Sequence, residues 1–192
     1  MGGPLCDSDP IAAGVGLIFT PTPIGGTYIV EIEPENDDRG FFARTWCAEE
    51  LSRAGLVANL SQCSISNNRY AYTLRGMHYQ TEPDIETKLV SCRAGALFDV
   101  IVDLRPGSPT YKQWFGTELT AGNYRSLYIS PGIAHGFLTL ENNTEVYYQI
   151  SGTYAPTSGR GVRWNDPAFD IQWPAKPAMM AERDRDYPDF LA

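Results

Sequence analysis

Hydrophobic and polar residues alternate most clearly over residues 96–104. This alternation predicts a β-strand, because successive side chains of a strand point to opposite faces of a sheet. One face of the strand carries Phe98, Val100, Val102 and Leu104, and the other carries Asp99, Ile101 and Asp103. The strand ends at a turn sequence, Arg-Pro-Gly-Ser-Pro, at residues 105–109.

Similar patterns recur along the chain, separated at short intervals by Gly, Pro, Asn and Asp. They predict further strands at 27–33, 60–66, 87–93, 114–120, 125–129, 136–140 and 144–150. One early helix is predicted at residues 47–54, where Gly55 provides a C-cap. Many short strands separated by turns are typical of a sandwich or barrel. We therefore expect an all-β fold, a small antiparallel barrel whose mouth holds one ligand.

The last segment, residues 175–192, mixes Lys, Arg, Asp and Pro. It predicts either a short helix packed on the barrel or a loosely ordered tail. No internal repeat, low-complexity block or linker interrupts the chain, and its 192 residues are typical of one domain. We therefore expect a single domain over residues 1–192.

Composition narrows the possible classes of function. Apolar residues make up 43% and charged residues 20% of the chain, which excludes a disordered protein. The net charge of −8 argues against nucleic acid or an anionic membrane as a partner. No apolar run approaches the roughly 18 residues that span a bilayer.

The location of the protein is predicted from its first residues and its cysteines. Residues 1–7 lack the basic region of a secretory signal. The four cysteines form no Cys-x-x-Cys pair and no zinc-finger pattern; they are Cys6, Cys47, Cys63 and Cys92. We therefore expect a cytoplasmic protein with reduced thiols.

The chain has two histidines, His78 and His135, and His78 follows Arg75 by three residues. An imidazole beside a fixed cation can take a proton from carbon while the resulting negative charge is stabilised. The alternative is an ordinary core or surface histidine in a strand. Because strict alternation would place Arg75 and His78 on opposite faces, a shared pocket requires a bulge or irregular backbone near Gly76.

Several short motifs occur in a specific order. They are 38–42 (DRGFF), 74–80 (LRGMHYQ), 88–90 (KLV), 98–100 (FDV), 108–110 (SPT), 131–137 (PGIAHGF) and 163–167 (RWNDP). Together they closely resemble the dTDP-4-dehydrorhamnose 3,5-epimerase family of cupin-fold enzymes. The resemblance covers roughly residues 17–174.

This resemblance implies a cupin-like jelly roll and an enzyme that uses no cofactor or metal. Such an enzyme removes the acidic protons beside the 4-keto group of a nucleotide-linked 4-keto-6-deoxyhexose, at C3 and C5, and returns protons from the opposite face. The resemblance assigns the catalytic roles as follows: His78 is the general base, Asp166 the carboxylate that orients it, Lys88 a cation near the ketone, and Tyr148 the acid on the opposite face. Each role has a structural alternative. Asp166 would then be a loop-capping residue before proline, Lys88 a solvated strand edge and Tyr148 a packing residue.

The resemblance also implies a dTDP-linked substrate and a homodimer. The residues it assigns to substrate binding are Arg39, Phe42, Arg44, Gln62, Arg75, Asp99, His135, Tyr154 and Arg163. In the family's dimers, the segment that matches Arg39 and Phe42 reaches the neighbouring site. An exposed N-terminal strand also needs a partner for its edge.

The chain departs from the family pattern in its nucleotide-binding region. Arg44 stands where many members have Glu, and Cys63-Ser64 replaces Asp-Asn after Gln62. These departures leave the nucleotide base open. Gly152-Thr153 replaces an acidic-aromatic pair, which leaves open whether one carbon or two are epimerised.

Residues 131–135 resemble the second half of the metal-binding motif found in many cupins. The first half is missing because His78 is followed by Tyr79 and Gln80, which leaves too few imidazole ligands. We therefore expect no metal. The alternatives to a 3,5-epimerase are a single-carbon epimerase and a non-catalytic cupin that binds a sugar nucleotide. A ketoisomerase would have a second histidine close to the first in the sequence, and this chain has none beside His78.

Overall fold

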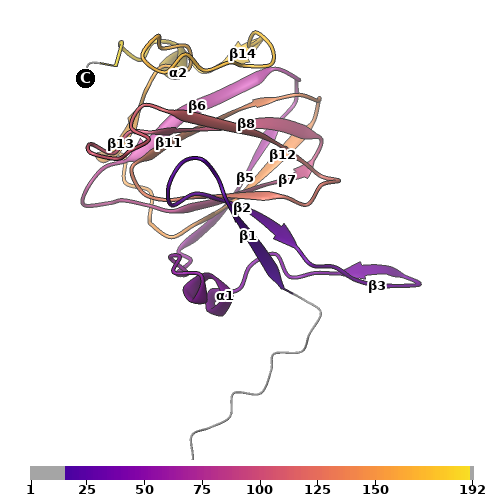
Figure 1. Cartoon of the computed structure of the whole chain (residues 1–192). Helices are drawn as coiled ribbons and strands as arrows, with labels where there is room; N and C mark the ends of the chain where they lie inside the picture. Colours follow the sequence, from indigo (N-terminus) through magenta and orange to yellow (C-terminus); the bar gives the residue numbers. More distant parts are fainter. Residues whose placement is uncertain (1–15, 191–192) are drawn as a thin grey trace, which may run out of the picture.

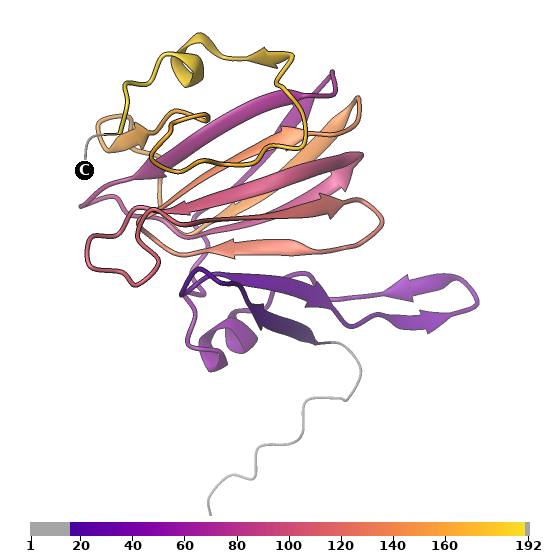
Figure 2. The ribbon, with the colours of Figure 1, turned by 45° about the horizontal axis from the view of Figure 1, so that its top comes forward.

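Two facing β-sheets form the body of the protein in the computed structural model, which describes residues 16–190 (Figure 1 and Figure 2). The first sheet has the strand order β1 (Leu17–Pro21), β2 (Tyr28–Ile32), β10 (Ser126–Ile129), β7 (Lys88–Ala94), β12 (Thr144–Ile150), β5 (Gln62–Asn68). The second has the order β13 (Gly159–Gly161), β6 (Thr73–Gln80), β11 (Ile133–Thr139), β8 (Ala96–Asp103), β9 (Trp114–Thr120), with β14 (Met179–Met180) added beside β6. A separate hairpin contains β3 (Glu35–Asp37) and β4 (Gly40–Phe42), and the helices are α1 (Ala48–Arg53) and α2 (Glu182–Arg185).

The pairing confirms the predicted antiparallel jelly roll. All paired strands run antiparallel except β14, which runs parallel to β6. The two sheets share no strand, so the predicted barrel is an open pair of facing sheets. The helix predicted at 47–54 is α1, and Gly55 follows it with a φ of 74°, the left-handed conformation that glycine adopts readily.

Strand β8 is buried on both of its faces. Leu97 and Ile101 belong to the cluster between the two sheets, whereas Val100 and Val102 pack against the C-terminal part of the chain. That part contributes apolar residues to the outer face of the second sheet, namely Val162, Phe169, Ile171, Trp173 and Phe190. The alternation predicted for residues 96–104 is confirmed. Of the two alternatives for the tail, the one observed through residue 190 is a short helix packed on the barrel.

Helix α1 covers the outer face of the first sheet. Its Leu51 is buried with Val30, Leu89 and Tyr128, which come from β2, β7 and β10. The Tyr128 hydroxyl accepts a hydrogen bond of 3.0 Å from the Val57 N–H. Within residues 16–190, no helix is long and apolar enough to cross a membrane.

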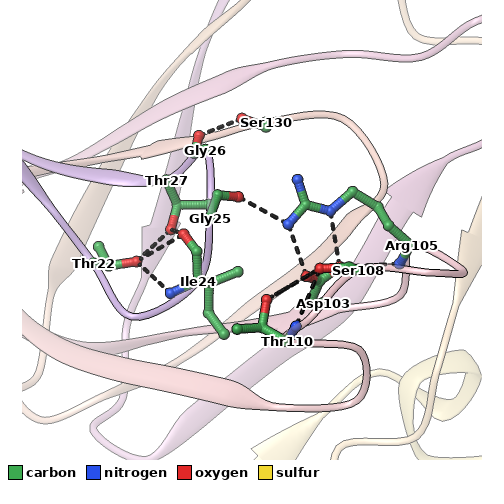
Figure 3. Close-up of polar contacts among 10 residues, drawn as sticks. All are labelled: Thr22, Ile24, Gly25, Gly26, Thr27, Asp103, Arg105, Ser108, Thr110 and Ser130. Carbon is green, nitrogen blue, oxygen red and sulfur yellow. Dashed lines mark hydrogen bonds and ion pairs between the residues drawn. The ribbon is translucent and has the colours of Figure 1, made fainter.

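Asp103 anchors several loops at one end of the sheets (Figure 3). Its buried carboxylate accepts hydrogen bonds from the Arg105 guanidinium (2.7 and 2.8 Å), the Ser108 hydroxyl (2.6 Å) and the Thr110 hydroxyl (2.7 Å). Arg105 also donates to the Gly25 carbonyl, 2.8 Å away, in the turn between β1 and β2. That turn carries Ile24, which is fully buried between the sheets.

We predict that Asp103→Asn destabilises the protein in a pH-dependent way. Burial opposes ionisation of Asp103, but the bonds from Arg105, Ser108 and Thr110 outweigh it and hold the carboxyl pKa far below its usual value. A depressed pKa stabilises the folded state above the unfolded-state pKa of about 4, and this contribution is lost as the pH falls through the lower folded-state pKa. Asp103→Asn should cost about 2–4 kcal/mol at pH 7 and less at pH 3, measured by urea unfolding. A cost that does not change with pH would contradict this account.

Candidate functional site

A cavity of about 940 Å³ opens beside β6 and β12. This volume is within the range of small-molecule sites, on the order of 300–1,000 Å³. Strands from both sheets and the C-terminal segment line it. The predicted site residues that the cavity brings together are Arg75, His78, Lys88, His135, Tyr148 and Tyr154.

An irregular backbone in β6 places Arg75 and His78 at the same cavity. The register between β6 and β11 shifts between the His135 and Phe137 pairs, and Gly76 has a φ of 132°. A Cβ atom at Gly76 would lie only 2.4 Å from the Gly136 Cα, so the two strands approach closely at this point. The irregularity predicted near Gly76 is therefore confirmed.

His78 is paired with a carboxylate from the C-terminal segment. Its Nε2 lies 2.7 Å from Asp184 Oδ1, and the Gly76 N–H donates to Asp184 Oδ2 over 3.2 Å. Asp184 is buried, which opposes its ionisation, but the bond and charge of His78 and the Gly76 N–H outweigh this effect and hold its pKa below the usual value. The Asp184 carboxylate is therefore a fixed negative charge against the imidazole.

The prediction that Asp166 is the partner of His78 is wrong. The Asp166 carboxylate instead accepts hydrogen bonds from the Ala168 N–H (2.9 Å) and the Phe190 N–H (2.7 Å). The bond from Ala168 matches the alternative in which Asp166 caps a loop. Asp166 does not line the cavity.

The arrangement of His78 is suited to a general base. When its Nε2–H donates to Asp184, the lone pair lies on Nδ1, where it can accept a proton. The carboxylate then stabilises the imidazolium that forms, as in any His-Asp pair. The Arg183 guanidinium lies beside the pair, with Nη2 3.1 Å from His78 Nε2 and Nε 3.3 Å from Asp184 Oδ1.

Lys88 and Arg75 bring positive charge to the cavity. The Lys88 ammonium is 3.0 Å from Glu86 and donates to the His78 carbonyl over 3.4 Å. Its side chain is 12% exposed, so the alternative of a solvated strand edge does not describe it. The Arg75 Nε donates to Asn68 Oδ1 over 2.8 Å. Both cations are thus held by fixed partners.

Tyr148 comes from the sheet that faces His78. His78 lies on β6 of the second sheet and Tyr148 on β12 of the first. Burial, reinforced by the charge of Asp99 and opposed by Arg75, raises the pKa of the Tyr148 phenol well above its usual value. Tyr148 therefore keeps its proton at neutral pH and can act as a donor.

A second His-carboxylate pair lies beside Tyr148. His135 Nε2 is 2.7 Å from Asp99 Oδ1, both residues are buried, and the His135 and Tyr148 rings meet edge to face at 6.2 Å. His135 lines the cavity, whereas Asp99 does not. Among the residues that the structure describes, Asp99 Oδ2 has no hydrogen-bond partner.

The remaining predicted substrate-binding residues lie outside the cavity of their own chain. Arg39 and Phe42 are on the β3–β4 hairpin, which projects away from the sheets (Figure 2). Arg44 pairs with Glu50 at α1, and Arg163 pairs with Asp189 near the end of the chain. Gln62 does not line the cavity, but its side chain accepts a 2.9 Å hydrogen bond from the N–H of Tyr154, which does.

Sequence reasoning missed the C-terminal residues of the cavity, Arg183, Asp184 and Tyr187. The one feature of the sequence that could have indicated them is the charged run Glu-Arg-Asp-Arg-Asp at 182–186. Alternating charges of this kind are, however, more typical of a solvent-exposed segment. What distinguishes Asp184 from its neighbours is its burial beside β6, and local sequence does not show this.

The cavity shows no cluster suited to a metal ion. Over residues 16–190, no group of three or more His, Cys, Asp or Glu side chains gathers at one point. In both histidines, Nε2 forms a hydrogen bond with an aspartate oxygen. Cys47, Cys63 and Cys92 are free thiols, and Cys6 lies outside the described residues.

Comparison with known proteins gives consistent matches over nearly the whole chain. The family model of dTDP-4-dehydrorhamnose 3,5-epimerase matches residues 21–191, which include the segment that carries Asp184. A Sinorhizobium fredii dTDP-4-dehydrorhamnose 3,5-epimerase is 36% identical, covering 91% of this chain and 90% of its own. A Streptomyces niveus dTDP-4-dehydrorhamnose 3-epimerase is 38% identical over 85% of this chain and 80% of its own. The crystal structure of a Bacillus anthracis dTDP-4-dehydrorhamnose 3,5-epimerase with TDP and PPi bound has a TM-score of 0.87 and 37% identity, covering 91% of this chain and 100% of that one.

We predict that catalysis at this cavity needs no metal, because no group of three or more possible ligand side chains gathers at one point within residues 16–190. Exhaustive chelation, followed by metal analysis, should leave turnover unchanged. Turnover that is lost on chelation and restored by a divalent ion would overturn this prediction.

Proposed function

The chain belongs to the dTDP-4-dehydrorhamnose 3,5-epimerase family, and from that premise we propose that its cavity epimerises C3 and C5 of a dTDP-linked 4-keto-6-deoxyhexose. Epimerases are isomerases, so the chain is an enzyme of that class. The observation that carries the proposal is the placement of His78 and Tyr148 on facing sheets around one cavity.

The first step is removal of a proton next to the ketone. The keto group acidifies the neighbouring C–H bonds, and His78 Nδ1 takes the proton while Asp184 stabilises the resulting imidazolium. The electrons of the broken bond move toward the ketone oxygen and form an enolate. Lys88 and Arg75, held at the cavity by Glu86 and Asn68, supply the positive charge that stabilises it.

The second step is return of a proton from the opposite face. Tyr148 is suited to it because its raised pKa keeps the phenol protonated and because it projects from the sheet opposite His78. A carbanion is a much stronger base than a phenolate, so the phenol can still donate. Inversion at carbon follows from the separate positions of the base and the acid. A module that merely binds sugar nucleotides would not need such a pair.

A single-carbon epimerase is the second candidate, because the Streptomyces niveus relative is a 3-epimerase at similar identity. The same base and acid would serve one carbon or two. The substitution of Gly152-Thr153 for the usual acidic-aromatic pair also bears on this choice. We favour both carbons because the matching family model and the Sinorhizobium fredii and Bacillus anthracis relatives are those of 3,5-epimerases.

We predict that the protein exchanges sugar C–H for deuterium when it is incubated with dTDP-4-keto-6-deoxyglucose in deuterated water. NMR should locate the label at both C3 and C5. Label at one carbon alone would select the single-carbon epimerase. Binding without any label would identify a non-catalytic cupin and refute the proposal.

Two matched variants separate the base from the acid in this experiment. His78→Asn should abolish exchange while nucleotide binding, measured by calorimetry, changes little. Tyr148→Phe should still allow exchange, because deprotonation needs only the base and the cations. In Tyr148→Phe the yield of epimerised sugar should fall much more than the rate of deuterium exchange, since loss of a positioned acid costs about 10²- to 10⁴-fold. Equal loss of exchange and epimer would instead make Tyr148 a packing or positioning residue.

We also propose that the protein is a cytoplasmic homodimer, with one domain in each chain. The free thiols of Cys47, Cys63 and Cys92 support the location. The β3–β4 hairpin supports the dimer, because Phe42 is 70% exposed on it and the Arg39 side chain is 90% exposed. Large exposed apolar side chains on a projecting element are typical of an interface. A second copy would receive Arg39 and Phe42 near its own cavity.

We predict that light scattering after size exclusion reports a dimer, and that Phe42→Asp weakens it. Tyr70→Ala is the control, because Tyr70 is another exposed aromatic residue and lies far from the hairpin in the sequence. A wild-type protein that is monomeric and fully active would contradict the proposal.

A further inference from the structure

Asp166 is a buried carboxylate that the proposed reaction does not use. It is 1% exposed, and it forms no ion pair with any residue of the described part of the chain. Its two oxygens accept hydrogen bonds from the N–H groups of Ala168 and Phe190. Burying a carboxylate costs free energy unless hydrogen bonds compensate it. A neutral side chain would avoid this cost, so the carboxylate calls for an explanation.

The bond to Phe190 connects Asp166 to the segment that carries Asp184. This segment, residues 178–190, is attached at both of its ends: its start is bound at β6, and its end is bound to the loop that carries Asp166 and Phe169. At its start, the Ala178 N–H donates to the Tyr72 carbonyl over 2.9 Å, and β14 pairs with β6. At its end, Phe190 donates to Asp166 over 2.7 Å, and its ring packs 5.1 Å from that of Phe169.

Asp184 lies between these two attachments, on α2. This helix has only four residues, and an isolated helix of that length is unstable in water. The position of the Asp184 carboxylate against His78 therefore depends on how both ends of the segment are held.

We propose that Asp166 is a positioning residue: by holding the end of the C-terminal segment at Phe190, it keeps Asp184 in place against His78. This inference rests on the proposed function of His78. Asp166 contacts neither the cavity nor the imidazole, so it can affect His78 only through the C-terminal segment, whose carboxylate Asp184 pairs with the imidazole. A carboxylate suits this role because hydrogen bonds from N–H groups to a charged acceptor are stronger than those to a neutral one. It also offers an oxygen to each of two donors, whereas an asparagine offers one.

The first test is kinetic. Asp166→Ala should lower kcat roughly 10- to 100-fold, because a catalytic group that shifts by about 1 Å costs on this order. KM should change less than kcat, since Arg75 on β6 and Lys88 on β7 stay in place. Asp166→Asn should give a smaller loss. Asp103→Asn is the matched control: it removes a buried carboxylate from a different loop cluster and should keep kcat near the wild-type value.

The second test asks whether Asp166 acts through Asp184. Asp184→Asn should itself lower kcat strongly, because it removes the charge that supports the imidazolium. In that background, adding Asp166→Ala should change kcat by less than about twofold, since coupled groups are not additive. An equal fold-loss from Asp166→Ala in both backgrounds would overturn the proposal. If Asp166→Ala does not fold, Asp166→Asn decides the same comparison.

A third measurement separates this inference from the proposed function. Hydrogen exchange by mass spectrometry should show lost protection at residues 182–190 in Asp166→Ala, with β8 and β11 unchanged. An inactive wild type whose Asp166→Ala variant shows this local loss would refute the proposed reaction but not the attachment of the segment. Unchanged protection and unchanged kcat in the variant would refute the role of Asp166.

Discussion

The close approach of β6 and β11 at two glycines is the constraint on which the cavity depends. A Cβ atom at Gly76 would lie 2.4 Å from Gly136 Cα, and one at Gly136 would lie 2.6 Å from Met77 Sδ. The backbone at Gly76 can adopt its φ of 132° at low cost only because glycine has no side chain. The resulting irregularity brings Arg75 and His78 to one cavity, and it directs the Gly76 N–H at Asp184. One local feature of the backbone thus orients the base, a cation and the carboxylate.

The C-terminal part of the chain, residues 162–190, contributes both to stability and to the proposed function. Its apolar side chains cover the outer face of β8 and β11, so the second sheet is buried on both sides. Removing this apolar area from water is the main favourable free-energy term that holds this part of the chain in place. The same part of the chain places Asp184 against His78. A change that loosens the packing at Phe169 or Phe190 should therefore also disturb the base.

The two His-carboxylate pairs have the same geometry but different surroundings. Nε2 lies 2.7 Å from a carboxylate oxygen in each pair, yet the side chain of His78 is 31% exposed and that of His135 is 5% exposed. Only His78 can readily meet a substrate that enters from solvent and later exchange its proton. The charge of −8 on the whole chain does not prevent the cavity from being locally cationic, because Arg75, Lys88 and Arg183 all line it.

The sequence by itself determined the strands, the all-β class and much of the cavity. Alternation at residues 96–104 and the turn at 105–109 are local properties, so they predicted β8 and its end. The motif around His78 predicted the irregular backbone, because two side chains three residues apart could share a pocket in no other way. Tertiary structure alone decided which carboxylate meets His78. Asp184 is 106 residues from His78 in sequence, and nothing local separates it from Asp166, which also lies in a polar, turn-rich segment. The choice between them was made by the path of the C-terminal segment along β6, and that path depends on apolar contacts among residues far apart in the chain.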